Sequence, residues 1–147
     1  MNTDSNDKTI TDETRRKLKD LSKSFLRLHK ILLEGEKAEY EKTNGRIGSP
    51  NQYLQLVLND PQFAWLRRMS SLIALVDEAC SIRRPATEDA AKALTDETEK
   101  LLTFAGDDES FNDKFNIALQ KNADASVTLN DTLNILKNSR QNALSDK

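Results

Sequence analysis

The residues of this sequence that could do chemistry together lie on one predicted helix near the start of the chain. His29 and Glu36 are seven residues apart, which places them on the same side of a helix, and Tyr40 follows Glu36 by one turn. They fall close to the apolar stripe of that helix, which consists of Leu18, Leu21, Phe25, Leu28 and Leu32. An imidazole that shares a pocket with a carboxylate can act as a general base or hold a polar ligand.

Two carboxylates on other predicted helices could complete such a pocket. Asp77 lies on one shoulder of the apolar arc of its helix, and Glu97 lies among the apolar residues of the next helix. The sequence therefore predicts a candidate polar pocket, lined by His29, Glu36, Tyr40, Asp77 and Glu97.

The favoured alternative is that these polar side chains only satisfy one another, because buried polar groups need hydrogen-bond partners. In that interpretation His29 pairs with a carboxylate and Glu36 pairs with Tyr40. Asn122, on the apolar face of the last predicted helix, then fixes the register of the helices.

Metal and cofactor chemistry has little support in the sequence. The chain has one His and one Cys, whereas zinc sites use several such ligands and a disulfide needs two thiols. Di-iron bundles need a Glu three residues before a His on each of two helices, and no Glu precedes His29 at that spacing. No nucleophile elbow, phosphate loop or dinucleotide fingerprint is present. We therefore expect no metal and no cofactor. A protein without catalytic activity is favoured over an enzyme.

The elements that must position these residues are predicted to be helices. The chain has 147 residues, 37% hydrophobic and 31% charged, with four Gly and three Pro, a composition that favours amphipathic helices in a single domain, 1–147. We expect an all-α antiparallel bundle of four long helices plus one short connecting helix. The predicted long helices span residues 12–43, 61–83, 88–104 and 110–139, the short helix spans 50–59, and residues 1–9 and 140–147 are expected to fray.

Capping residues set the starts of these helices. Thr11 and Thr87 are typical N-caps, and Ser49 and Asp60 each precede a proline at the first helical position. On the helix over 61–83, Trp65 falls in the middle of a wide apolar arc and is predicted to anchor the core.

The same arc separates the other reactive groups of the helix over 61–83. Cys80 lies inside the arc, as an inert packed thiol. Arg67 lies opposite it, as a solvated charge, whereas Arg68 and Asp77 occupy the two shoulders.

A stripe of cations runs along the outer face of the first helix. This candidate basic surface consists of Arg16, Lys19, Lys23, Arg27 and Lys30. It could dock an acidic partner, RNA or an anionic membrane. No aromatic residue is interleaved for base stacking, and the apolar face opposite is needed for the core, so a solvated outer face is the favoured interpretation.

The overall charge gives no general attraction to polyanions. The net charge is −2, although residues 1–86 carry 15 basic and 12 acidic side chains and residues 87–147 carry 7 and 12. We expect the two halves to pack together, and we expect neither nucleic acid nor a membrane as a partner. Because the sequence shows neither a signal peptide nor a long apolar run, a cytoplasmic protein is expected.

Two segments, LHKILLEGEKAEYEKTNG and NDPQFAWLRRMSSLIALVDE, resemble a family of small, uncharacterised, all-helical bacterial proteins. Members carry a similar LHK–LL–E–YE segment followed by a DPQFAWLR–LS–LI–DE segment. The resemblance covers residues 27–80 and implies a bacterial source and a helical fold, but no chemistry. It includes His29, Glu36, Tyr40, Trp65, Asp77 and Glu78.

Two functions follow as expectations. The first is a non-enzymatic interaction or regulatory module, which binds an unidentified protein or a second copy of itself as a homodimer. The alternative is a small-molecule-binding protein or enzyme whose polar pocket surrounds His29.

Overall fold

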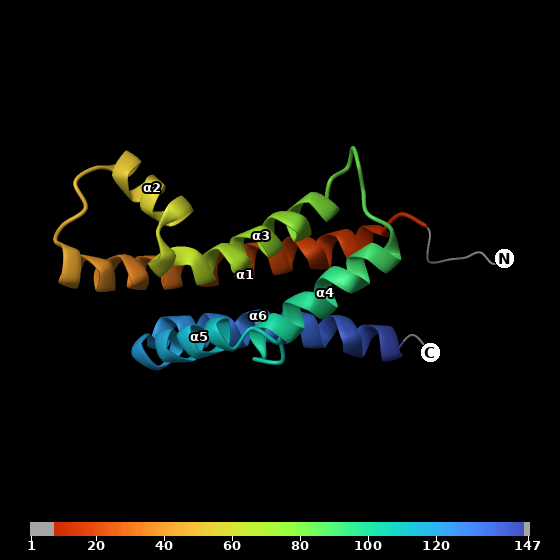
Figure 1. Ribbon diagram of the computed structural model, residues 1–147. Helices are drawn as coiled ribbons and strands as arrows, with labels where there is room; N and C mark the ends of the chain where they lie inside the picture. Colours follow the sequence, from red (N-terminus) through yellow and green to blue (C-terminus); the bar gives the residue numbers. More distant parts are fainter. Residues whose placement is uncertain (1–7, 146–147) are drawn as a thin grey trace.

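The computed structural model describes residues 8–145 of the chain, with side chains for residues 8–138. All regular secondary-structure elements in that range are helices, so the predicted all-α class is confirmed (Figure 1). In chain order the elements are α1 (Asp12–Asn44), α2 (Pro50–Asn59), the 3-10 turn η2 (Pro61–Phe63), α3 (Ala64–Ala79), α4 (Glu88–Leu102), α5 (Glu109–Lys121) and α6 (Ala123–Ser145).

The predicted capping residues start the helices. The hydroxyl groups of Thr11, Ser49 and Thr87 accept hydrogen bonds from the backbone N–H three residues on, at the starts of α1, α2 and α4. Gly45, with a φ of 85°, ends α1 in a backbone conformation that glycine adopts without strain.

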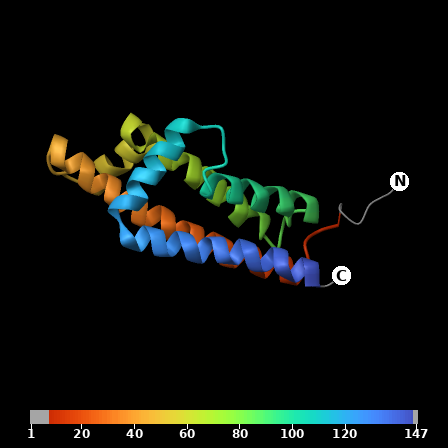
Figure 2. The ribbon, with the colours of Figure 1, turned by 90° about the horizontal axis from the view of Figure 1, so that it is seen from below.

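Helix α1 is the spine of the molecule. It packs most extensively against α3 on one side and α6 on the other, while α4 contacts both α3 and α6 (Figures 1 and 2). Hydrogen bonds join Arg15 to the carbonyl of Cys80, and Trp65 to Glu36. Since these bonds link opposite ends of α1 and α3, the two helices run antiparallel.

The helix predicted over residues 61–83 is shorter than expected. Its first turn is η2, and α3 ends at Ala79, after which the N–H groups of Cys80 and Ser81 turn back to Asp77 and Glu78. The Ser81 hydroxyl then accepts from the N–H of Arg84, a local bond that competes with helix continuation ahead of Pro85.

The helix predicted over residues 110–139 is two helices, and the structure corrects this expectation at Asn122. Asn122 has an extended backbone, and its side-chain oxygen accepts a hydrogen bond of 3.2 Å from the N–H of Ala125. It ends α5 and caps α6, instead of fixing register within one helix. Asparagine is among the residues that most favour such a capping position.

The end of α4 is closed by a residue that the sequence does not single out. Phe104 has a φ of 63°, and the N–H of Ala105 bonds to the carbonyl of Lys100, which is the pattern of a Schellman motif. Glycine usually occupies that position, but the nearby Gly106 lies two residues further on. The Phe104 ring instead packs on Phe115, with 5.1 Å between ring centroids.

Backbone hydrogen bonds or helix reach both ends of the described range, while most of the residues expected to fray at the N-terminus lie outside it. Lys8 and Ile10 exchange backbone hydrogen bonds with Glu88 and Ala86, and Thr9 forms a β-bridge with Thr87. Helix α6 continues to Ser145, past the predicted end at residue 139. Residues 1–7 and 146–147 lie outside the described range.

The buried side chains form two clusters. The aromatic core contains Phe25, Leu28, Leu32, Phe63, Trp65, Leu66, Met69, Ile73, Leu101, Leu102, Phe111, Phe115 and Ala125. The aliphatic core contains Ile10, Leu18, Leu21, Val76, Ala79, Cys80, Ala91 and Leu136. Trp65 and Cys80 are buried as predicted, whereas Leu75, on the same helix, is half exposed.

Hydroxyl groups occupy part of the helix interfaces. Thr98 and Thr132 are fully buried, and each donates to the carbonyl four residues earlier in its own helix. Ser24 of α1 then bonds to the Thr132 hydroxyl at 2.6 Å. These bonds satisfy the buried oxygens without a charged partner. In the described part of the chain, no helix has both the length and the apolar character needed to cross a membrane.

Candidate functional site

Glu36 is the best-positioned polar group of those predicted to form a pocket. One carboxylate oxygen accepts a hydrogen bond of 2.9 Å from the indole N–H of Trp65, and the other accepts one of 2.8 Å from the side-chain amide of Gln62. The two donors come from α3 and η2, whereas Glu36 lies on α1. The carboxylate is therefore held in one orientation by two uncharged donors.

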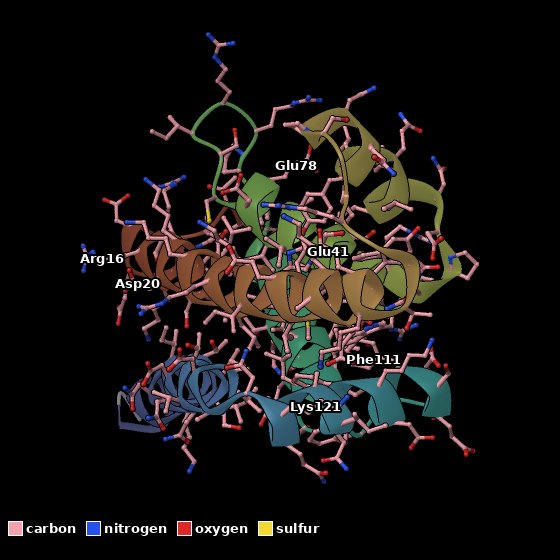
Figure 3. All side chains as sticks on the ribbon, turned by 90° about the vertical axis from the view of Figure 1, so that its left-hand side faces the viewer. Arg16, Asp20, Glu41, Glu78, Phe111 and Lys121 are labelled. Atoms are coloured by element: carbon pink, nitrogen blue, oxygen red, sulfur yellow. The ribbon has the colours of Figure 1, made fainter. Side chains whose placement is uncertain are left out.

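Trp65 is fixed in turn by the aromatic core. Its ring centroid lies 5.8 Å from that of Phe111 and 6.4 Å from that of Phe115, both on α5. Figure 3 shows Phe111 on the side of α5 that faces α1 and α3. This packing links α5 to the carboxylate on α1 through a single buried ring.

A cavity of about 430 Å³ opens beside Glu36, between α1 and α5. The α1 wall includes Leu32, Gly35, Glu36 and Glu39, and Gln62 contributes from η2. The opposite wall comes from α5 and the residue that follows it, and consists of Lys114, Ile117, Ala118, Lys121 and Asn122.

The charged residues around this cavity differ in their partners. Glu39 contacts Lys42 at 3.1 Å and Lys121 at 3.7 Å, and the hydrogen bond from Lys42 is the main cause of the lowered pKa of Glu39. Glu36 and Lys114 form no ion pair with any side chain of residues 8–138. The cavity thus holds one carboxylate and one ammonium that lack a charged partner there.

His29 lies on α1 apart from this cavity. Partial burial lowers the pKa of its imidazole, and a hydrogen bond to the backbone of Leu66 partly opposes that shift. The neutral ring is therefore the favoured form at neutral pH. No carboxylate of residues 8–138 lies within 4.0 Å of the imidazole, so the expected carboxylate partner is not found there.

Tyr40 lies one turn beyond Glu36, as predicted, but the bonds of Glu36 go to Trp65 and Gln62. The Tyr40 ring packs on Phe63, with 5.9 Å between centroids, at the edge of the aromatic core. Tyr40 and Glu36 thus lie in the same region of α1 and contact different neighbours.

Asp77 and Glu97 are exposed and lie elsewhere. Asp77 is near the end of α3, where its charge helps to raise the pKa of the Cys80 thiol, although burial is the larger cause. Glu97 lines a second cavity of about 310 Å³ with Arg68, Lys100 and the loop 106–108. Arg68 also contacts Asp108 there, at 3.9 Å. The structure therefore does not bring the five predicted pocket residues together.

The predicted basic surface lies on the outside of α1. All five of its residues are exposed, and none forms an ion pair with a side chain of residues 8–138. We call it the basic face, and it consists of Arg16, Lys19, Lys23, Arg27 and Lys30. Figure 3 shows Arg16 and Asp20 projecting outward from the same flank of α1, so one carboxylate lies at the edge of this face.

Several residues with specific roles were missed or misjudged from the sequence. Arg67, predicted as a solvated charge, donates to the carbonyls of Val57 and Asp60 at the end of α2, where a cation is favoured. The amide of Gln62 and the ammonium of Lys114 were not singled out. The signal for Gln62 is its place after Asp-Pro, where the Asp60 side chain caps its N–H.

Among the residues that the structure describes, no group of three or more His, Cys, Asp or Glu side chains is placed to hold a metal ion. None of the family models, curated proteins and solved structures compared with the chain matches it. The interpretation of the site therefore rests on the geometry of this chain.

Proposed function

We propose that the chain is a non-enzymatic interaction module that presents the basic face of α1 to an acidic segment of another protein. The observation that supports this proposal is the exposure of all five cations of that face, without an ion pair to any side chain of residues 8–138. Cations held in solvent on one rigid helix offer complementary charge at fixed spacing to an acidic partner.

An exposed apolar side chain at one edge of the basic face favours a protein partner. Leu26 is 55% exposed, and Lys23 and Lys30 lie one turn before and after it on the same side of α1. An exposed apolar side chain bordered by cations is a pattern that an amphipathic helix with acidic flanks can complement. The partner we propose is such a helix.

Nucleic acid and anionic membranes are less well matched to this face. No aromatic ring lies among the five cations for bases to stack on, because Phe25 is fully buried in the core. Asp20 lies at the edge of the face, and the net charge of −2 gives no long-range attraction to a polyanion. A short acidic helix needs only the local charge.

In this proposal, the predicted antiparallel bundle of four long helices is the scaffold that keeps α1 straight. Helices α1, α3, α4 and α6 would be its four columns, with α5 leading into α6, and the contacts between consecutive columns support that arrangement. A second copy of the chain is a competing partner, because residues 87–147 carry an excess of acidic side chains.

The alternative function, an enzyme or ligand site built around His29, has less support. His29 has no carboxylate within 4.0 Å among residues 8–138, and it lines neither of the two cavities described above. A general base needs a substrate proton within hydrogen-bond reach.

The test is a fluorescence-anisotropy titration of the full chain against a labelled helical peptide of about 20 residues, with Leu on one face and Glu on its flanks. We expect binding that weakens at least about tenfold between low and moderate salt, because the contact is charge-based. The triple variant K23E/R27E/K30E should abolish it. A matched control, R83E/R84E/K137E, makes the same charge change at exposed positions on other elements and should keep it.

Competing partners are measured in parallel with a single-stranded RNA and with anionic lipid vesicles. Tighter binding to either probe than to the peptide would overturn the proposal, as would equal loss in both triple variants. Sedimentation of the chain alone tests whether the partner is a second copy of the chain. Self-association that K23E/R27E/K30E abolishes would mean that the basic face binds another copy and not a different acidic protein.

A further inference from the structure

We propose that the cavity between α1 and α5 binds a small zwitterion of the amino-acid class, with its ammonium on Glu36, its carboxylate on Lys114 and its apolar body against Leu32 and Ile117. This site is separate from the basic face of α1 and does not depend on the function proposed above. Four features of the cavity carry the inference.

The first feature is the carboxylate of Glu36. Each of its oxygens accepts one hydrogen bond from an uncharged donor, Trp65 or Gln62, and can accept another. Its negative charge is half-buried and has no cation within 4.0 Å among the side chains of residues 8–138. A ligand ammonium would supply both the missing donors and the missing charge.

The second feature is the ammonium of Lys114 on the opposite wall. Lys121, the other lysine of the cavity, contacts Glu39, whereas Lys114 forms no ion pair with the side chains that the structure describes. A carboxylate on the ligand would give the ammonium of Lys114 an anionic partner. One carboxylate and one ammonium on facing walls match a ligand that carries both charges.

The third feature is the apolar part of the lining. Leu32 and Ala118 line the cavity beside the charged groups, and Ile117 also lines it although its side chain is 51% exposed. An apolar ligand body would remove the exposed surface of Ile117 and Ala118 from water, whereas Leu32, at 2% exposure, contributes little. The volume of about 430 Å³ is within the range of small-molecule sites.

The fourth feature is Gly35, a glycine in the interior of α1 that lines the same cavity. Glycine destabilises a helix relative to alanine, so its presence there has a cost. A Cβ at Gly35 would meet no atom within 4 Å, which means that packing does not require the glycine. What a larger side chain at this position would occupy is the cavity itself.

Trp65 provides a direct readout, because it is the only tryptophan and its N–H bonds to Glu36. We would titrate the full chain with L-leucine, following tryptophan fluorescence and, in parallel, NMR chemical shifts, up to about 50 mM of ligand. Isoamylamine lacks the carboxylate of leucine, and 4-methylpentanoate lacks its ammonium. We expect saturable binding of leucine and at least about tenfold weaker binding of both analogues.

Variants separate binding from folding. Gly35→Leu should retain the folded state, since leucine is a better helix former than glycine, and should abolish binding by filling the cavity. Lys114→Met, at an exposed position, should weaken leucine binding while leaving isoamylamine binding unchanged. The control Lys100→Met, in the cavity lined by Glu97, should bind leucine like the unmodified chain.

Three results would overturn the proposal. The first is the absence of a saturable signal for leucine over the whole range. The second is equal affinity for leucine and either analogue, which would mean that one of the two charges is not recognised. The third is unchanged leucine binding in Gly35→Leu, which would place the ligand outside this cavity.

Discussion

The aromatic and aliphatic cores of this protein differ in the polar groups that pack against them. The aromatic core brings Trp65 and several phenylalanines together at one end of α1, next to the cavity beside Glu36. The aliphatic core contains no aromatic ring among its buried residues. Within it the Cys80 thiol bonds to the carbonyl of Val76, and at its edge Glu88 accepts from the N–H of Thr11 and the hydroxyl of Thr14.

The difference follows from the side chains themselves. Indole and phenol rings fill more space than Leu or Val, but each has a polar edge that needs a partner when it is buried. Trp65 therefore requires an acceptor inside the bundle, and Glu36 is that acceptor. Aliphatic side chains make no such demand. The cavity beside Glu36 thus lies where aromatic rings are packed.

The largest expected effects come from removing the packing itself. Phe115→Ala removes a fully buried ring that contacts Trp65, Phe104 and Phe111, and should lower the free energy of unfolding by about 4 kcal/mol. Leu21→Ala, its counterpart in the aliphatic core, should cost about 3 kcal/mol. Urea denaturation of both variants gives the two values. A larger loss for Leu21→Ala would reverse the proposed ranking of the two cores.

The hydrogen-bonded carboxylate should give the next largest effect. Glu36→Ala leaves the buried N–H of Trp65 without its acceptor and should lower the free energy of unfolding by about 2 kcal/mol. It should also shift the tryptophan emission. Glu97→Ala, at an exposed carboxylate of the other cavity, is the matched control and should change stability by less than about 0.5 kcal/mol. Equal effects in the two variants would contradict a structural role for Glu36.

Much of the helical order could be predicted from the sequence, because its signals are local. The N-caps at Thr11, Ser49 and Thr87, and the burial of Trp65 and Cys80, depend on spacing along one helix. The break at Asn122 was missed because the apolar pattern continues through it, whereas its extended backbone and its capping bond to Ala125 show that the helix restarts.

The candidate site was harder to predict, because it depends on which helices face each other. Glu36 was identified by its place on an apolar stripe, but its partners lie on η2 and α3, and the lysine opposite it lies on α5. No periodicity within α1 contains that information. For the same reason His29, Asp77 and Glu97 were grouped with Glu36, although their helices place them in different surroundings.

A titratable group in each core should also make the folded state less stable, at mildly acidic pH for the aromatic core and at alkaline pH for the aliphatic core. Burial lowers the pKa of His29, which lies beside Leu66 of the aromatic core, below its usual 6.5. Between the lowered pKa of the folded state and 6.5, the unfolded chain binds more protons than the folded one. The contribution of His29 to stability is therefore complete above pH 6.5 and falls as the pH drops below it. His29→Gln should reduce this acid loss, as measured by urea midpoints from about pH 7 to 5.

In the aliphatic core the sign is reversed. Burial raises the pKa of the Cys80 thiol above its usual 9.0, so the unfolded chain releases this proton first and stability falls as the pH rises through 9. Cys80→Ala should remove that part of the alkaline loss, while His29→Gln should leave it unchanged. Loss of both trends in a single variant would mean that the two cores do not titrate separately.

The smallest expected effect concerns a second polar edge beside the aromatic core. The hydroxyl of Tyr53 is the one buried side-chain oxygen or nitrogen among residues 8–138 that has no hydrogen-bond partner, and burial raises its pKa. Tyr53→Phe keeps the edge contact with Phe63 and removes the unpaired hydroxyl, so it should raise the free energy of unfolding by about 0.5 kcal/mol. Trp65→Phe, which removes a polar edge that does have an acceptor, should lower it by about 1–3 kcal/mol. Urea denaturation gives the free energy of unfolding of both variants. If the two substitutions lower it equally, the presence of a hydrogen-bond acceptor for the ring matters less than the volume of the ring. The two cores would then differ only in how their side chains pack.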